Sequence, residues 1–218
     1  MSEIEVDDRV ASPGSRINSR VLGLALLVII ALTTVVIMIQ SGDDASPSAT
    51  DVAEEFVDAY RVEFDIPAAF SYLAPGAVGL ETQDQEEVLA EYLTAVGSKS
   101  IVAPCEVLAS TAEAVQVGCP YQYHMLRSDE IGLGPYAGNS FLITVSEGQI
   151  TSVELTFDDS TPDTFSTEMW NPFRSWMNRT HPEDVPVMYD GEGWRISAES
   201  IPLWEQRTIE YAQAAEQG

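Results

Sequence analysis

Basic side chains are scarce in this sequence. Its 218 residues include 10 Lys plus Arg against 35 Asp plus Glu, a formal net charge of −25 at pH 7. Nucleic acids and anionic membrane surfaces repel a protein with such a charge, so we expect no nucleic-acid partner. The acidic surface is either a solvated face that aids solubility or a surface that loosely binds cations or a basic partner.

Cysteine is also scarce, since Cys105 and Cys119 are the only two. Two cysteines without further Cys or neighbouring His cannot complete a tetrahedral zinc site, so no metal site is expected. No cysteine stands directly after the long apolar run near the amino terminus, and this excludes a lipoprotein anchor.

Recognisable catalytic strings are missing as well. The sequence contains no phosphate-binding loop, zinc-protease or nucleophile-elbow pattern, and no internal repeat. The glycines of GLGPYAG, residues 132–138, have the wrong spacing for a dinucleotide-binding loop. We therefore expect no cofactor and assign no catalytic residue.

One long apolar run is present near the amino terminus. Residues 21–39, VLGLALLVIIALTTVVIMI, contain no ionisable side chain, and their only polar ones are Thr33 and Thr34. A helix of this length can cross about 30 Å of hydrocarbon, whereas a cleaved signal usually has a shorter apolar region and a small-residue cleavage site. We predict a transmembrane helix over residues 21–40. A cleaved signal and a buried helix of a soluble protein are the alternatives.

The charges around this run predict its orientation. Arg9, Arg16 and Arg20 precede it, and the first basic residue after it is Arg61. Basic flanks stay in the cytoplasm, so residues 1–20 are predicted to be a disordered cytoplasmic tail of a single-pass cell-membrane protein. The rest is predicted to lie outside the cytoplasm, as a linker over 41–50, a folded domain over 51–160 and a helical extension over 161–218.

Apolar residues at a period near 3.6 predict three helices at the start of the outer region. Ser48 or Thr50 can cap the first of them. Its apolar face comprises Val52, Phe56, Ala59, Tyr60 and Phe64. PAAFSYLAPG, residues 67–76, predicts a short second helix. Thr82 with Gln85 forms a capping-box pattern before the third, which Gly97 can end.

Between residues 100 and 158 the apolar residues alternate in twos. This period is typical of strands with one buried face, and it predicts four antiparallel strands. Odd positions from Cys105 to Phe157 carry the apolar and tyrosine side chains, while even positions such as Glu106 and Glu154 face the other way. SEGQ, residues 146–149, supplies the turn between the last two strands.

The two cysteines fall in the first two predicted strands. If that hairpin turns near Ala112, then Cys105 and Cys119 are mirror positions and face each other across the ladder. An oxidising compartment outside the cytoplasm lets disulfides persist. We predict a Cys105–Cys119 disulfide.

Three helices followed by a four-stranded antiparallel meander is also the order of a known fold. Over residues 51–158 the chain resembles the SnoaL-like, nuclear-transport-factor-2-like (cystatin-like) cone superfamily, above all in FLITVSEGQITSVELTFD, residues 141–158. The segment from Met169 onward resembles the tail of a membrane-anchored bacterial subset of mostly unknown function. The resemblance implies an α+β fold in which three helices pack on the sheet around a pocket.

The tail has helix signals of its own. Asn171 with Pro172 is a helix-start pair, and a last helix is predicted to begin near Ser200. Trp204, Thr208, Tyr211 and Ala215 then form a stripe of period 3.6. Such a stripe packs against the cone or docks on a partner or a membrane interface.

The residues expected nearest the pocket are Tyr60, Tyr121, Tyr123 and Phe157. Enzymes on this scaffold place an Asp or His base inside, and the inward-facing strand positions here offer chiefly Tyr, Val, Ile and Phe. We therefore predict a non-catalytic domain, tethered through residues 21–40, that binds an apolar small molecule or another cell-envelope protein. The alternative is an isomerase- or hydratase-like enzyme that uses the pocket.

Other polar residues are weaker candidates. His124 is a rival base, but its even position puts it on the face opposite Tyr123. We expect a surface or packed histidine, and the alternatives are a catalytic, a pH-responsive or a metal-binding role. His181 resembles part of a helix stop. Asp158 and Asp159 end a strand, where turn chemistry favours Asp.

Overall fold

The structure, a computed structural model, describes residues 47–158, 160–191 and 193–217. They belong to one compact unit. The predicted cytoplasmic tail and transmembrane helix, residues 1–40, lie outside the described residues. Within the described part, no helix has both the length and the apolar character needed to cross a bilayer.

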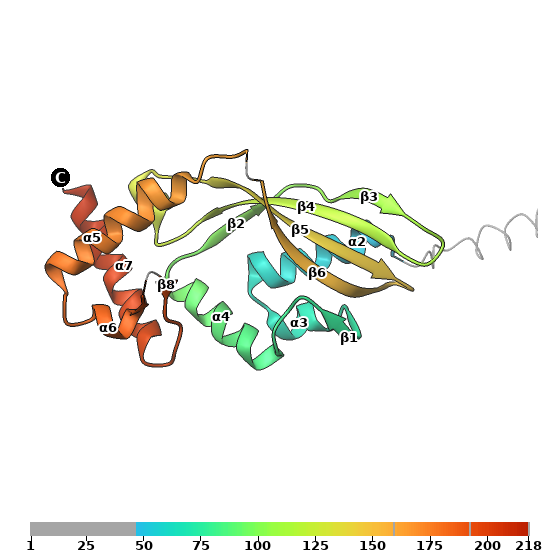
Figure 1. Ribbon diagram of the computed structural model, residues 1–218, viewed down its shortest axis with the longest axis horizontal. Coiled ribbons are helices and arrows are strands. Elements are labelled where there is room, and N and C mark those ends of the chain that lie inside the picture. The colour runs from blue at the N-terminus through green and yellow to red at the C-terminus, as the bar shows by residue number, and fades with distance from the viewer. Residues whose placement is uncertain (1–46, 159, 192, 218) are drawn as a thin grey trace, which may run out of the picture. The chain divides into compact units, whose positions relative to one another are not determined.

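The described residues form a mixed α+β fold (Figure 1). The helical segments are α2 (Ala49–Val57), η1 (Asp58–Glu63), α3 (Ile66–Phe70), α4 (Gln83–Ala95), η2 (Ser128–Ile131), η3 (Ser166–Trp170), α5 (Asn171–Thr180), α6 (Val185–Met188) and α7 (Ser200–Glu216). The strands are β1 (Leu73–Val78), β2 (Lys99–Val102), β3 (Glu106–Ser110), β4 (Val115–His124), β5 (Tyr136–Ser146), β6 (Gln149–Phe157), β7 (Tyr189–Asp190) and β8 (Gly193–Trp194).

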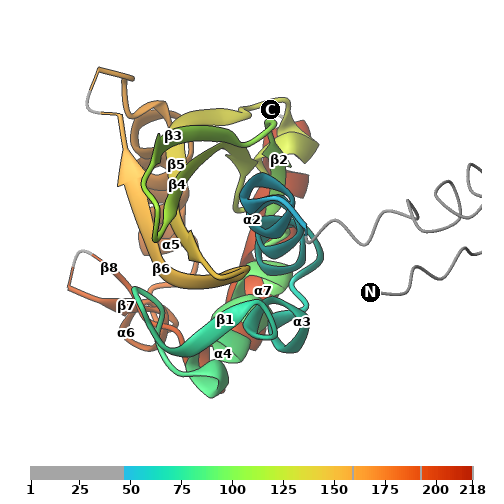
Figure 2. The ribbon, with the colours of Figure 1, turned by 90° about the vertical axis from the view of Figure 1, so that its right-hand side faces the viewer.

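The main sheet has six strands and is mixed. Its order is β1-β6-β5-β4-β2, and β3 also pairs with β4. The predicted four-stranded antiparallel sheet is therefore wrong in strand number and in one direction, because β1 pairs with β6 in parallel. Strands β3 to β6 arc opposite helix α2, and α3 lies beside β1 (Figure 2). This is the arrangement of helices on a curved sheet that a cone implies.

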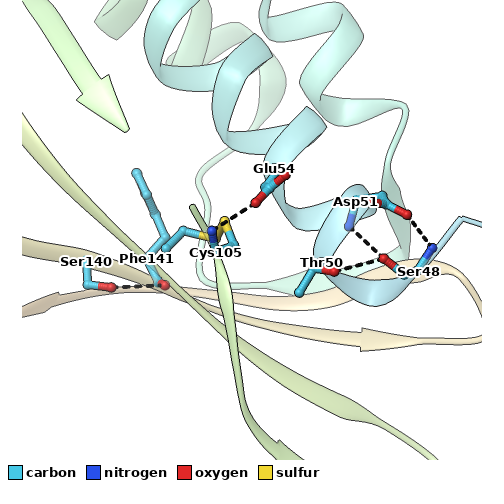
Figure 3. Close-up of a disulfide and its surroundings, with 8 residues drawn as sticks. Ser48, Thr50, Asp51, Glu54, Cys105, Ser140 and Phe141 are labelled. Atoms are coloured by element: carbon cyan, nitrogen blue, oxygen red, sulfur yellow. Dashed lines mark hydrogen bonds between the residues drawn. A yellow bond between two sulfur atoms is a disulfide. The ribbon is translucent and has the colours of Figure 1, made fainter. Parts of the chain in front are cut away.

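Helix α2 begins at the predicted cap. The Ser48 hydroxyl accepts the Asp51 N–H at 3.1 Å, and the Ser48 N–H donates to the Asp51 carboxylate at 2.9 Å (Figure 3). Each of these groups would otherwise lack a partner at the helix start, so the reciprocal pair fixes where the helix begins. Phe56 and the neighbouring Val52 and Val57 are buried on its inner face.

The second predicted helix is only half correct. Helix α3 ends at Phe70, and the residues that follow, which the prediction placed in the same helix, form the edge strand β1. Pro75 and Gly76 disfavour a continued helix, and an edge strand tolerates a proline because it needs no inward donor there. The third predicted helix is confirmed as α4, which follows Thr82 and ends before Gly97.

The predicted first strand is interrupted at Pro104. Strand β2 pairs with the end of β4, from Val102↔Tyr121 to Lys99↔His124, whereas β3 pairs with the beginning of β4. Proline cannot donate to a ladder, so the break falls at this residue. The two short strands together occupy one edge of the sheet.

The predicted hairpin register and disulfide are confirmed. Glu106 lies opposite Gly118 and Val107 opposite Val117, and the register shifts only after Val107. Cys105 and Cys119 form a disulfide with their Cα atoms 4.3 Å apart. The Cys105 N–H also donates to the Glu54 carboxylate at 2.9 Å, which joins the disulfide to α2 (Figure 3).

The predicted alternation holds for the centre of the sheet and fails at β3. Cys119, Ile143 and Val153 are buried on the inner face. Val107 was expected on the same face, but it is 54% exposed. The reason is that all five residues of β3 are exposed at the sheet edge, so a side chain on the inner face of β3 has no core residues to pack against.

The described residues contain two hydrophobic clusters. The first lies between the sheet and α2, and includes Phe56 and Ile143. The second joins α4 to the tail, and includes Tyr92, Phe173 and Trp204. The helical extension therefore packs on α4, and the last predicted helix is confirmed as α7. The predicted helix start at Asn171 is wrong, because α5 continues directly from η3 and Asn171 itself has helical backbone angles.

Candidate functional site

A cavity of ≈ 700 Å³ lies between the sheet and the helices. We call it the inner cavity. Its walls come from η1, the segment 79–81, α4 and the inner face of β4, β5 and β6. Phe165 and Trp194, from the tail, complete the lining. All four residues that the sequence analysis placed nearest a pocket line this one cavity: Tyr60, Tyr121, Tyr123 and Phe157.

Most of the inner cavity is apolar. The aliphatic and phenyl part of its wall comprises Leu80, Leu89, Leu93, Phe141, Val153 and Leu155. Tyr121 stacks on Phe141 with ring centroids 5.1 Å apart, and Tyr60 meets the same ring edge-on at 5.9 Å. A cavity of this size with a few polar groups is typical of a small-molecule site.

A buried carboxylate also lines the inner cavity. Glu86, on α4, is only 5% exposed. One of its oxygens accepts the Tyr60 hydroxyl at 2.7 Å, and the other accepts the Glu81 N–H at 3.0 Å. The expectation that Tyr, Val, Ile and Phe chiefly line the pocket is therefore incomplete. The acid comes from a helix, whereas the parity argument covered only the strands.

A sequence signal for Glu86 existed. It lies three residues before Leu89 and seven before Leu93, which places it on the same apolar stripe of the helix. An acid on the buried stripe of an amphipathic helix needs a partner inside the fold. Tyr60, across the cavity on η1, is that partner.

Arg61 brings a positive charge to the same wall. Its guanidinium carbon lies 5.4 Å from the centre of the Tyr121 ring. Its Nε is buried and has no hydrogen-bond partner among the described residues. Arg61 and Glu86 thus give the inner cavity one donor group and one acceptor group in otherwise apolar surroundings.

Burial keeps the cavity tyrosines protonated. Burial raises the pKa of Tyr60 far above its ordinary value, and the hydrogen bond to Glu86 raises it further. Burial and then the Asp163 charge raise the pKa of Tyr123 to about 12. Burial also raises the pKa of Tyr121, which the Arg61 charge opposes. These hydroxyls are neutral at physiological pH and can orient a ligand.

The weaker candidates lie elsewhere. The Nδ1 atom of His124 is 3.1 Å from the Leu133 carbonyl oxygen and 3.3 Å from the Ser128 hydroxyl, and His124 does not line the inner cavity. His181 caps the end of α5, as the sequence indicates, and its Nε2 is 3.2 Å from the Glu210 carboxylate. Asp158 forms a turn with Ser160.

His181, Glu183 and Asp184 form a group of possible metal ligands. The Arg207 guanidinium donates to the Asp184 carboxylate at 2.7 Å and to the neighbouring Glu210 carboxylate at 2.7 Å. A cation therefore already neutralises Asp184, and Glu183 is exposed, so we assign no metal site here.

Comparison with known proteins gives structural neighbours alone. No family model and no curated protein matches the chain. Similar solved structures include an NTF2-like protein of unknown function from Cytophaga hutchinsonii, at 19% identity over 53% of this chain and 94% of that one (TM-score 0.36). A domain of unknown function with a cystatin-like fold from Nostoc punctiforme matches at 12% identity over 78% and 94% (TM-score 0.38).

An LEH-like epoxide hydrolase of M. tuberculosis is also similar, at 16% identity over 62% of this chain and 96% of that one (TM-score 0.36). One of these three neighbours is described as NTF2-like and one as having a cystatin-like fold. They include enzymes and proteins of unknown function.

Proposed function

We propose that this domain binds a small, largely apolar molecule in the inner cavity, without reaction, while residues 21–40 hold the chain in the cell membrane with its bulk outside the cytoplasm. The observation that supports the binding role is the cavity of ≈ 700 Å³ with an apolar wall and one polar corner. A ligand that loses about 200 Å² of apolar surface there gains about 5 kcal/mol before its entropy cost.

The polar corner supports a ligand with one neutral polar end. Arg61 offers a donor and Glu86 an acceptor, and the Tyr121 hydroxyl lies on the same wall. A hydroxyl group both donates and accepts a hydrogen bond, so it can bind to Glu86 and Arg61 together without adding charge. A carboxylate end would face Glu86 at close range, and this repulsion disfavours it.

The binding proposal is tested with a neutral apolar dye, N-phenyl-1-naphthylamine, and the full-length chain in a non-ionic detergent. Leu155→Trp narrows the inner cavity at an exposed lining position and should weaken dye binding at least about tenfold. Val107→Trp is the matched control, because Val107 is similarly exposed and lies outside the lining. Equal dye affinity in both variants would contradict the proposal.

A second candidate function is an isomerase- or hydratase-like reaction in the same cavity. The observation that favours it is the buried Glu86 carboxylate, which is within a cavity able to hold a substrate. Both Glu86 oxygens already accept a hydrogen bond, and this leaves the carboxylate a weaker candidate for proton abstraction. Mass spectrometry of the molecule that co-purifies with the protein tests this role. If the wild type changes the mass of that molecule and the Glu86→Gln variant does not, the enzyme is favoured.

Contact with another cell-envelope protein, the other expected role, stays a prediction. Cross-linking in native membranes, followed by identification of the linked proteins, tests it. Recovery of one specific envelope protein would support that role, and recovery of none would leave ligand binding as the sole proposed role.

A further inference from the structure

A second cavity, of ≈ 600 Å³, adjoins the inner cavity where the end of β6 meets the tail. We call it the rim cavity. Its aromatic lining comprises Tyr123, Phe157, Phe165, Trp170 and Trp194. Phe157 and Trp194 are 67% and 43% exposed, respectively. So much exposed ring surface in one hollow is unusual unless it contacts something.

The rings of the rim cavity meet at steep angles. The Trp170 and Trp194 centroids are 5.3 Å apart with the ring planes at 80°, and those of Tyr123 and Phe165 are 5.7 Å apart at 62°. Rings at such angles present their faces from different directions. Because aromatic faces carry negative partial charge, a positive group beside several of them is stabilised.

The charge of the lining has one sign. Asp158 and Asp163 line the rim cavity, and none of its described lining residues is Lys, Arg or His. The protein as a whole is also strongly acidic. Both the local and the overall field therefore favour a cation and repel an anion.

The two carboxylates supply charge more than hydrogen-bond acceptors. The Asp158 oxygens accept the Ser160 N–H at 2.9 Å and the Thr161 hydroxyl at 2.9 Å. These donors, with Ser160 the strongest, hold the pKa of Asp158 below its usual value. One oxygen of Asp163 accepts the Ser166 N–H at 2.9 Å. Asp158 thus remains ionised, while the chain itself occupies several acceptor sites of both carboxylates.

We propose that the rim cavity binds a quaternary ammonium group. A sugar needs many free acceptors and donors, and a lysine ammonium brings three N–H donors that each need an acceptor. A quaternary ammonium has no N–H, so aromatic faces and fixed negative charge satisfy it. Its source is either a free choline-like molecule or the head group of a choline lipid. The ligand proposed here differs from the one proposed for the inner cavity, although both cavities are lined by Tyr123, Asn139, Phe157, Phe165 and Trp194.

The test compares choline with its neutral isostere 3,3-dimethylbutan-1-ol, which has the same shape without the charge. Binding to the full-length chain in a non-ionic detergent is followed by tryptophan fluorescence, since Trp170 and Trp194 line the cavity. Choline should bind saturably and at least about tenfold more tightly than the isostere. Absence of saturable choline binding, or equal binding of the two compounds, overturns the proposal.

Variants locate the site. Asp158→Asn with Asp163→Asn removes both charges and keeps an acceptor oxygen for the turn and for Ser166, so choline affinity should fall about tenfold with the circular dichroism spectrum unchanged. Glu106→Gln with Glu113→Gln removes the same charge from the exposed β3–β4 hairpin and should leave affinity unchanged. An equal loss in both pairs would indicate a general field effect and would overturn the proposed site.

Two further measurements identify the source and separate the two cavities. Monomeric short-chain phosphatidylcholine that binds the wild type at least as tightly as choline, and binds the Asp158→Asn/Asp163→Asn variant at least about tenfold more weakly, assigns the lipid head group as the source. Binding of free choline without binding of the short-chain lipid assigns the free molecule. Binding of the neutral dye should be unchanged in this variant, because neither Asp lines the inner cavity.

Discussion

At the scale of single residues, the buried Glu86 carboxylate links the two sides of the inner cavity. It accepts one hydrogen bond from η1, through Tyr60, and one from the segment before α4, through the Glu81 N–H. A buried donor that loses its acceptor pays its full desolvation cost. Glu86 therefore contributes to stability as well as to the chemistry of the cavity.

We predict that Glu86→Ala lowers the free energy of unfolding by about 2–4 kcal/mol, because the Tyr60 hydroxyl and the Glu81 N–H both lose their acceptor. Urea denaturation followed by circular dichroism measures the change. Glu87→Ala is the control, since Glu87 is the exposed neighbour on the same helix and should change stability by less than about 0.5 kcal/mol. Similar losses in the two variants would show that Glu86 has no special role.

The buried tyrosines give a second prediction, in alkali. Burial raises the pKa of Tyr92 far above its ordinary value, as it does for Tyr60 and Tyr189. The folded state then holds protons that the unfolded state releases above about pH 10, so stability is fully present below that pH and falls as the pH rises. Each such tyrosine adds about 1.4 kcal/mol per pH unit to the loss.

Chemical denaturation from pH 8 to 11.5 measures this loss. Absorbance at 295 nm should show tyrosinate forming together with unfolding rather than before it. Ionisation of all tyrosines near pH 10 in a chain that stays folded would contradict the prediction.

Residue by residue, the candidate site was half predictable. Strand parity identified Tyr121, Tyr123 and Phe157, because alternation in a strand fixes which face a side chain takes. Arg61 and Glu86 come from helical segments, which the parity argument did not cover. Glu86 had a sequence signal in its place on the apolar stripe of α4, whereas nothing in the sequence distinguishes Arg61 from a solvated surface residue.

At the scale of secondary-structure elements, the disulfide fastens the start of β3 to β4. All five residues of β3 are exposed, so this edge strand has little burial of its own to hold it. The cross-link and the Glu54 hydrogen bond to the Cys105 N–H are its connections to the buried part.

We predict that replacing Cys105 and Cys119 together by Ser lowers the free energy of unfolding by about 3 kcal/mol, the value for closing a loop of this length in the unfolded chain. Urea denaturation with and without reductant measures it. Reductant should destabilise the wild type to a similar extent and leave the double variant unchanged. A variant as stable as the oxidised wild type would contradict the prediction.

Strand β1 and the segment after it provide a matched pair of glycines, Gly76 within the strand and Gly79 just after it. Both Gly76 and Gly79 have positive φ, +82° and +98°, which strains any other residue. A Cβ on Gly79 would lie 1.7 Å from the Val153 carbonyl oxygen, whereas one on Gly76 would meet nothing within 4 Å. We predict that Gly76→Ala costs about 1 kcal/mol and that Gly79→Ala costs about 3 kcal/mol or more. Thermal unfolding compares the two variants, and equal shifts in Tm would refute the close approach of these backbones.

Some elements were predictable and some were not. Helix α4 and the hairpin from β5 to β6 follow from strong local signals, a capping pair and a clear alternation with a tight turn. Strand β1 was taken for helix, because Leu73–Val78 has no period of two and gains its strand form only by pairing with β6, more than 70 residues later. Pairing between strands so far apart in the chain produces no local sequence pattern from which the strand could be predicted.

At the scale of the whole molecule, the proposed anchor, residues 21–40, determines on which side of the membrane the domain lies. We predict that protease added to intact cells removes the domain, because the arginines precede the apolar run and no cleavage site follows it closely. Immunoblotting of the cells measures its loss. Deletion of residues 21–40 is the control and should leave the chain in the cytosolic fraction, protected from the protease. Protection of the intact chain would contradict the orientation.

The tail of the chain has a consequence for the order of folding. Helix α4 buries Tyr92 against Trp204 of α7, about 110 residues further along the chain. At ribosomal rates of synthesis this separation corresponds to roughly 5–20 s. During that interval the apolar side of α4 has no tail to cover it, so the nascent chain exposes a hydrophobic surface to which chaperones can bind until α7 is synthesised.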